Sequence, residues 1–170
     1  DRGDVRIVAA LLGYLALKVL HIVAAMVFLG TGLGSAWYRW RADRSGSPAV
    51  VVWCQEEIVR ADLYFTVPAA VLLVASGWGM VHTLGLPWST PWILAGAAGF
   101  AISGLFWLPA VYLQLELRRL AREALARGEP LPPRYWRAAR AWALLGVPSF
   151  GAALLTVWAM VAKDVFLGLP

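Results

Sequence analysis

The sequence has few of the residues from which soluble enzymes build their sites. Its single cysteine, Cys54, can supply neither a disulfide framework nor a multi-cysteine metal site. It contains no phosphate-binding loop, nucleophile elbow or zinc-protease motif. These absences argue against hydrolase chemistry of the soluble type.

Charge is scarce as well, at 15% of the residues, and it is unevenly distributed. The formal net charge of +5 comes mostly from arginines, which gather in two short segments, "YRWRADRSGSP" and "RRLAREALARGEPLPPRYWRAAR". These segments form no basic face interleaved with aromatic residues, so nucleic acid is not an expected partner. The pattern is typical of membrane topology signals.

Hydrophobic residues are abundant, at 61% of the chain against roughly 45–50% in a soluble domain. Because about 20 residues of helix cross a hydrocarbon core of about 30 Å, apolar runs of that length predict spanning helices. Four such runs cover about residues 7–37, 63–82, 92–115 and 141–162. We therefore expect an all-α integral membrane four-helix bundle that forms a single transmembrane domain over residues 1–170.

The charges of the links predict the orientation of this bundle. The link "TLGLPWSTP" between the second and third spans carries no charge, whereas both other links are rich in arginine. The positive-inside rule assigns the arginine-rich links to the cytoplasm. We expect both termini outside, in a multi-pass protein of a bacterial inner membrane.

Two of the predicted helices extend beyond the apolar runs. Residues 48–62 follow a Ser-Gly-Ser-Pro turn and predict a cytoplasmic lead-in continuous with the second span. Residues 114–126 extend the third span until Gly128 and the prolines after it. Small residues indicate close helix packing at Gly30 and Gly34 in the first span, and along the third span at Gly96, Gly99, Ser103 and Gly104.

Three ionisable side chains, Lys18, His21 and His82, lie within or beside the apolar runs. A charge in a bilayer costs at least about 2.5–3.5 kcal/mol on insertion scales, so such residues are functional candidates. Counted from the cytoplasmic edges at Arg39 and Asp62, the two histidines lie about 27 Å and about 30 Å along their helices. Two imidazoles at one level on adjacent antiparallel helices could ligate a haem iron.

Other residues could complete such a site. Tyr14 and Ala25 share the helical face of His21, and Gly79 lies near His82. Small residues leave room for a flat porphyrin, and Lys18 could pair with a propionate. Simpler interpretations stay open: solvation of His82 at the interface, snorkelling of the Lys18 side chain to the headgroups, or a structural hydrogen bond at His21.

The stretch "LALKVLHIVAAMVFLGTGLGSAWYRWRADR" resembles the first helix of an uncharacterised bacterial family of predicted four-helix integral membrane proteins. Segments such as "WLPAVYLQ" and "PPRYWR" extend the resemblance over nearly the whole chain. The pattern Lys18-Val19-Leu20-His21-Ile22 is also distantly similar to HemJ-type protoporphyrinogen IX oxidases, whose corresponding histidine is thought to bind haem. The hydropathy is similar to that of CopD-like membrane proteins.

One segment departs from the HemJ-type pattern. Those proteins carry a second lysine shortly after a tryptophan at the start of the third helix, where this chain has only the apolar "PWILAGAAG". The resemblance therefore implies haem at His21 rather than a particular reaction.

We predict a haem-binding integral membrane protein with a redox or electron-transfer role; as an enzyme it would be a HemJ-like oxidoreductase. Haem b is the expected cofactor, with His21 and His82 as candidate iron ligands. The expected partners are the lipid bilayer and quinone or another membrane redox protein. The alternatives are a non-catalytic accessory subunit of an oligomer or larger membrane complex, and a transporter of small molecules or metals.

Overall fold

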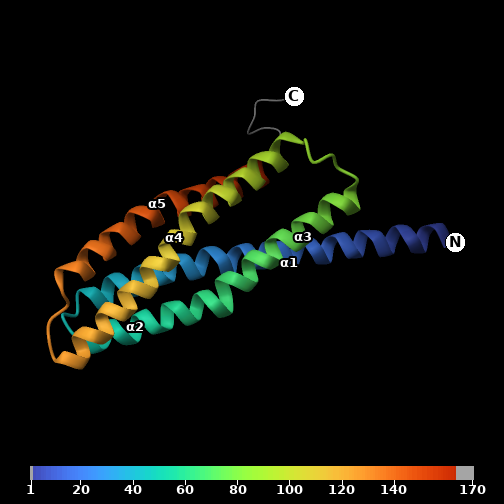
Figure 1. Ribbon diagram of the computed structural model, residues 1–170. Coiled ribbons are helices and arrows are strands. Elements are labelled where there is room, and N and C mark those ends of the chain that lie inside the picture. The colour runs from blue at the N-terminus through green and yellow to red at the C-terminus, as the bar shows by residue number, and fades with distance from the viewer. Residues whose placement is uncertain (1, 164–170) are drawn as a thin grey trace.

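The computed structural model describes residues 2–163, and its regular structure in that range is helical. The elements are α1 (Arg2–Asp43), α2 (Pro48–Ala61), the π-helical turn η1 (Asp62–Thr66), α3 (Val67–Leu84), α4 (Pro91–Arg127) and α5 (Pro133–Ala162). Four continuous helical segments are long and apolar enough to cross a membrane: Ile7–Asp43, Pro48–Leu84, Pro91–Arg127 and Pro133–Ala162. The prediction of an all-α chain with four spans is confirmed (Figure 1).

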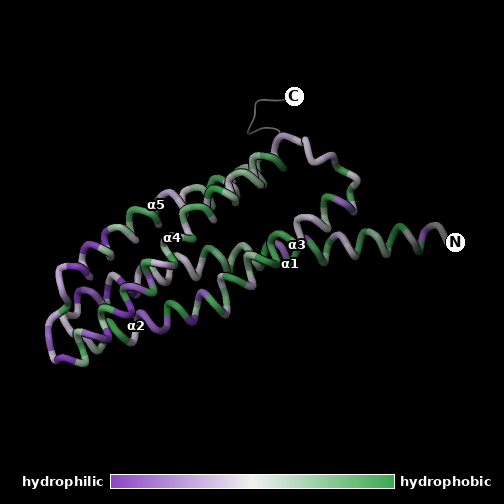
Figure 2. Tube along the Cα trace, in the orientation of Figure 1, coloured by the Kyte–Doolittle hydropathy of each residue, from purple (hydrophilic) through white to green (hydrophobic). Residues whose placement is uncertain are grey.

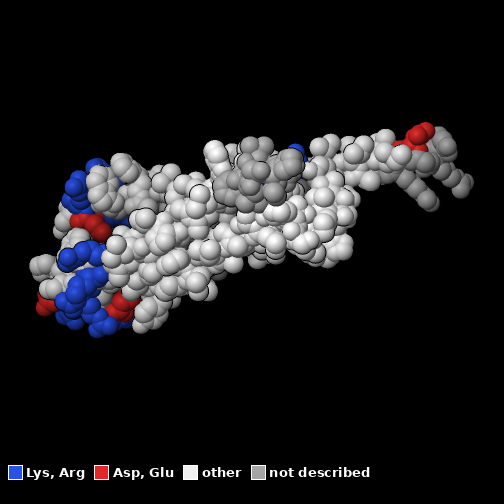
Figure 3. All heavy atoms as spheres, turned by 90° about the horizontal axis from the view of Figure 1, so that it is seen from above, with Lys and Arg blue, Asp and Glu red and all other residues white. Residues whose placement is uncertain are grey.

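Polar residues gather at one end of the molecule. Figure 2 shows hydrophilic residues where α1 ends, α2 begins, α4 ends and α5 begins, with apolar residues along the rest of the helices. Figure 3 shows that most arginine and lysine side chains lie at this same end, together with several acidic ones. We call it the arginine-rich end. The start of α1 and the end of α5 lie towards the opposite end (Figure 1).

Proline and glycine set the helix boundaries. Pro48, Pro91 and Pro133 stand at the first positions of α2, α4 and α5, where a missing backbone N–H costs nothing. Gly128 ends α4 with a φ of 65°, and the N–H of Glu129 closes the turn on the Ala124 carbonyl at 3.0 Å. The predicted lead-in and the predicted end of the third helix are therefore confirmed. The fourth helix begins at Pro133, earlier than the apolar run alone predicts.

The link between α2 and α3 is a widened helical turn rather than a break. Pro68 has no N–H to donate to the carbonyl four residues earlier, and its ring would crowd that carbonyl. The backbone widens just before it, where the Val67 N–H bonds the Asp62 carbonyl, five residues back. α2 and α3 thus form one continuous segment, Pro48–Leu84.

α4 and α5 pack closely through small residues. A Cβ atom on Gly99 would overlap Thr156 Oγ1 and lie 3.3 Å from the Ala152 carbonyl, and one on Gly96 would overlap the Met160 side chain. The Ser149 hydroxyl on α5 donates to the Ser103 carbonyl on α4 at 2.9 Å. The predicted packing role of this face of the third span is confirmed at these positions.

The chain is organised as two helix pairs that join at the arginine-rich end. α1 packs along α3, and α4 packs along α5. Among the described residues, α3 makes no backbone approach to α4 or α5. The pairs meet through α2 and α4 and through the end of α1 and the start of α5, around a core that includes Val51, Leu117 and Tyr135 (Figure 1). The tightest core of the molecule therefore lies at this end.

Candidate functional site

His21 is held from α3 by a serine. Its Nδ1 lies 2.9 Å from the Ser76 Oγ, and Ser76 is buried with 1% of its surface exposed. The Ser76 hydroxyl also donates to the Leu72 carbonyl one turn earlier. A hydroxyl has a single proton; with that proton directed to the Leu72 carbonyl, Oγ accepts the hydrogen bond from His21, and this assigns the imidazole proton to Nδ1.

This arrangement leaves the second ring nitrogen of His21 available. Nε2 carries no proton in that tautomer, and the side-chain hydrogen bond that holds the ring is made by Nδ1. Gly77 makes room for the ring, because a Cβ at that position would lie 3.3 Å from the His21 Cε1. A neutral imidazole oriented through Nδ1, with Nε2 free, is the form in which histidine binds a metal.

His82 does not lie at the level of His21. Ser76 and Gly77 are opposite His21, and Gly79 is opposite Leu17, where a Cβ would lie 3.0 Å from the Leu17 Cδ1. His82 follows Ser76 and Gly77 by five or six residues, or about 8 Å along α3. It is exposed, near the C-terminal end of α3, with its ring 4.3 Å from that of Trp78. The structure therefore differs from the equal depth that residue counting predicts.

The remaining predicted site residues lie around Leu17 and His21. Lys18 is exposed, and its Nζ lies 6.0 Å from the centroid of the half-buried Tyr14 ring. Ala25 is half-buried one turn beyond His21. Gly79 contacts Leu17 rather than a histidine. Of the predicted set, the structure places Tyr14, Lys18 and Ala25 along the helix that carries His21.

Sequence reasoning missed a buried polar network at the arginine-rich end. Arg39 is only 6% exposed, and its Nη2 donates to the Ala139 carbonyl at 3.3 Å. The Tyr135 hydroxyl donates to Asp43 and accepts from the Gln55 Nε2 at 3.1 Å. Three helices, α1, α2 and α5, are thereby joined. The sequence signal for this network was Gln55, the glutamine that follows the apolar stretch "PAVVVWC". A polar side chain next to so many apolar residues indicates a buried hydrogen bond.

A second polar contact joins η1 to α4. The Asp62 carboxylate accepts from the Thr66 hydroxyl at 2.7 Å and from the Gln114 Nε2 at 2.8 Å. Thr66 and Gln114 are each 3% exposed. Asp62 therefore anchors two buried polar side chains.

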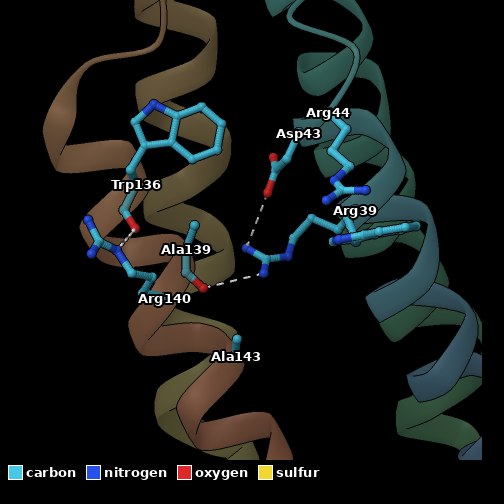
Figure 4. Close-up of a pocket in the computed structure, with 8 residues that line it drawn as sticks. Arg39, Asp43, Arg44, Trp136, Ala139, Arg140 and Ala143 are labelled. Carbon is cyan, nitrogen blue, oxygen red and sulfur yellow. Dashed lines mark hydrogen bonds and ion pairs between the residues drawn. The ribbon is translucent and has the colours of Figure 1, made fainter.

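An open groove of about 560 Å³ lies between the end of α1 and the start of α5 (Figure 4). α1 and the turn after it supply Arg39, Trp40, Asp43 and Arg44, and α5 supplies Trp136, Ala139, Arg140 and Ala143. In the part of the chain that the structure describes, no three histidine, cysteine or carboxylate side chains gather as a metal site. The two candidate sites are therefore His21 with Ser76, and this groove.

A family model described as "Predicted integral membrane protein (DUF2269)" matches residues 15–164. No curated protein and no solved structure matches the chain.

Proposed function

The chain belongs to this family of predicted integral membrane proteins, and we propose that it binds haem b through His21 and has a redox or electron-transfer role. The observation that supports this is the Ser76–His21 hydrogen bond, which leaves Nε2 of a neutral imidazole free on the membrane-crossing part of α1. Such an outer hydrogen bond orients an axial histidine and raises its basicity.

The residues around His21 fit one axial imidazole. Ser76 fixes the ring, Gly77 lets the ring pack closely against α3, and Lys18 supplies a cation one turn away for a propionate. Bound haem would supply a reversible one-electron change at its iron. His82 lies about 8 Å further along α3, so we propose His21 alone as the ligand from this chain.

The proposal includes an orientation of the chain in the membrane, which rests on the positive-inside rule. Arginine-rich links face the cytoplasm of a bacterial inner membrane, and His21 lies towards the outer side. Quinone or another membrane redox protein would then exchange electrons with the site from within the membrane or at its outer face.

The test is an absorption spectrum of the detergent-purified chain, expressed with ample haem and measured oxidised and dithionite-reduced. A Soret band with sharp reduced bands is expected in the wild type and in His82→Ala, and its loss is expected in His21→Ala. His82→Ala is the matched control, because it removes the other of the two histidines. A colourless wild-type protein would overturn the cofactor, and a Soret band retained in His21→Ala would overturn the ligand.

Ser76→Ala tests how the ring is positioned. Without the hydrogen bond from Nδ1, the imidazole donates less electron density, so the haem midpoint potential rises and the iron–histidine stretching frequency falls in a resonance Raman spectrum. Ser103→Ala is the matched control, since Ser103 is also buried but lies in the α4–α5 contact. Equal spectra in wild type and Ser76→Ala would contradict the positioning role.

A second candidate function is a structural subunit of a larger membrane complex. Among the described residues, a Cβ atom on Gly30 would meet no neighbouring atom within 4 Å. A Cβ atom on Gly34 would meet only the Tyr38 side chain of the same helix. Small residues of this spacing suit helix–helix association between chains. Cross-linking in native membranes distinguishes the two candidates. If the chain is a structural subunit, Gly30→Leu should abolish a cross-link to a partner. The same variant should leave the haem content unchanged.

A further inference from the structure

The groove at the arginine-rich end carries positive charge without full compensation. Arg39 forms its floor, and its Nε and Nη1 atoms have no hydrogen-bond partner in the described structure. Asp43 is the acidic residue in the lining; it lies 4.0 Å from Arg39 and already accepts the Tyr135 hydroxyl. One buried guanidinium therefore stands under the groove with a single, shared counter-charge.

Two exposed arginines flank this buried one. The Arg44 guanidinium lies over the Trp40 ring at 4.5 Å, and the Arg140 Nε donates to the Trp136 carbonyl at 3.4 Å. Neither forms an ion pair with a described carboxylate, whereas several arginines outside the groove pair with glutamates: Arg60, Arg119, Arg122, Arg127 and Arg134. Figure 4 shows Arg44 in the turn after α1 and Arg140 on α5, with the Arg140 guanidinium beside the Trp136 carbonyl and turned away from Arg39. Both side chains are exposed, and no described carboxylate neutralises either guanidinium.

The rest of the lining is apolar and leaves space towards the membrane. Ala139 and Ala143 form the α5 wall, one turn apart, with Ala143 on the side of the apolar span. One turn further, a Cβ on Gly146 would meet no described atom within 4 Å, and the same holds for Gly32, two turns before Arg39 on α1. The charged mouth of the groove therefore leads to unfilled space along both helices.

We propose that this groove binds one anionic phospholipid, with its phosphate at the mouth of the groove, within reach of the exposed Arg44 and Arg140 side chains, and an acyl chain along Ala139 and Ala143. Guanidinium groups match phosphate oxygens in bidentate geometry. Trp40 and Trp136 mark the depth at which headgroups lie. The apolar wall favours a lipid over free phosphate, because inorganic phosphate would gain nothing from it. This site is independent of His21, which lies about 27 Å away along α1.

The first experiment is native mass spectrometry of the detergent-purified chain titrated with dioleoyl phosphatidylglycerol or with dioleoyl phosphatidylcholine. One phosphatidylglycerol should remain bound at concentrations where phosphatidylcholine does not, and excess inorganic phosphate should not displace it. Equal retention of the two lipids would overturn the proposal. Displacement by millimolar inorganic phosphate would identify a free-phosphate site and overturn the lipid.

Variants separate charge from shape. Arg44→Gln with Arg140→Gln should weaken phosphatidylglycerol binding about 30-fold, since two arginines beside an anionic headgroup are removed. Arg127→Gln with Arg137→Gln removes the same charge outside the groove and should leave binding within about twofold. Equal losses in the two double variants would reduce the effect to general electrostatics and refute the site.

Ala143→Phe keeps every charge and fills the apolar wall. Ala143 is exposed, so the chain should fold, as gel filtration will verify. The expected result is loss of the bound phosphatidylglycerol at the wild-type half-saturation concentration. Unchanged binding in Ala143→Phe would show that no acyl chain lies there and would overturn the proposed pose.

Discussion

The contact between α4 and α5 gives a sharp test of the packing, because two glycines on α4 differ only in what surrounds them. Gly99 faces Thr156 and the Ala152 carbonyl, whereas a Cβ on Gly104 would meet no atom within 4 Å. Alanine at either position adds about 1 kcal/mol of helix propensity. Alanine at position 99 must also push α4 away from α5. The Ala152 carbonyl on α5 is part of the backbone, so it cannot rotate out of the way as a side chain could.

The cost of that separation can be set against the gain. Inserting a methyl group into a filled contact costs typically about 1–3 kcal/mol. Gly99→Ala should therefore be neutral to about 2 kcal/mol less stable than wild type, and Gly104→Ala up to about 1 kcal/mol more stable. The difference between the variants, about 1–3 kcal/mol, is the quantity that reports on the contact.

The assay is thermal unfolding in detergent, followed by tryptophan fluorescence. For a chain of this size each kcal/mol moves the midpoint by about 3 °C, so the two variants should differ by at least about 3 °C. Met160→Ala in the Gly99→Ala background serves as a control, since Met160 contacts Gly96 and should not relieve the clash. Identical midpoints for Gly99→Ala and Gly104→Ala would refute the close approach of the two helices.

Two further predictions concern buried polar groups. Tyr135→Phe removes a hydroxyl that makes two hydrogen bonds at 0% exposure and should destabilise the chain by about 2–4 kcal/mol in the same melting assay. Tyr112→Phe, at a 70% exposed tyrosine, should change the midpoint negligibly, and similar shifts in both would contradict the network. Asp62→Ala strands the buried Gln114 amide and should cost about 1–3 kcal/mol. Asp62→Asn should destabilise the chain less, because the Gln114 amide can turn over and accept a hydrogen bond from the asparagine. An equal loss of stability in both variants would show that the negative charge of Asp62, rather than its hydrogen bond, is what stabilises the contact.

Much of the fold could be predicted from the sequence, because it depends on single-chain patterns. Apolar runs of membrane length, Pro48 at the start of α2 and Gly128 at the end of α4 are local signals, and each is confirmed. The resemblance to a family of predicted integral membrane proteins is confirmed over residues 15–164, while the HemJ-type and CopD-like similarities stay predictions. Haem binding likewise stays a prediction.

The candidate site was harder to predict, because it depends on which helices face each other. The small-residue pattern alone could not separate Gly99, which contacts α5, from Gly30, where a Cβ would meet no atom of another described element within 4 Å. The residue count assumed that Arg39 and Asp62 lie at the same depth in the membrane. In the structure, Ser76 and Gly77 rather than His82 lie opposite His21. Arg39 was interpreted as a topology charge, yet it is buried in the joint between the two helix pairs.

The location of that joint has a mechanical consequence. Among the described residues, backbone contact between the two helix pairs is confined to the arginine-rich end, and further along the rings of Phe28 on α1 and Phe100 on α4 lie 5.9 Å apart. Each pair then acts as a lever roughly 30 Å long, so a rotation of about 6° at the fastened end moves the far ends by about 3 Å. A change in charge or packing around Arg39 and Tyr135 would therefore be felt most strongly at the other membrane surface, near His21.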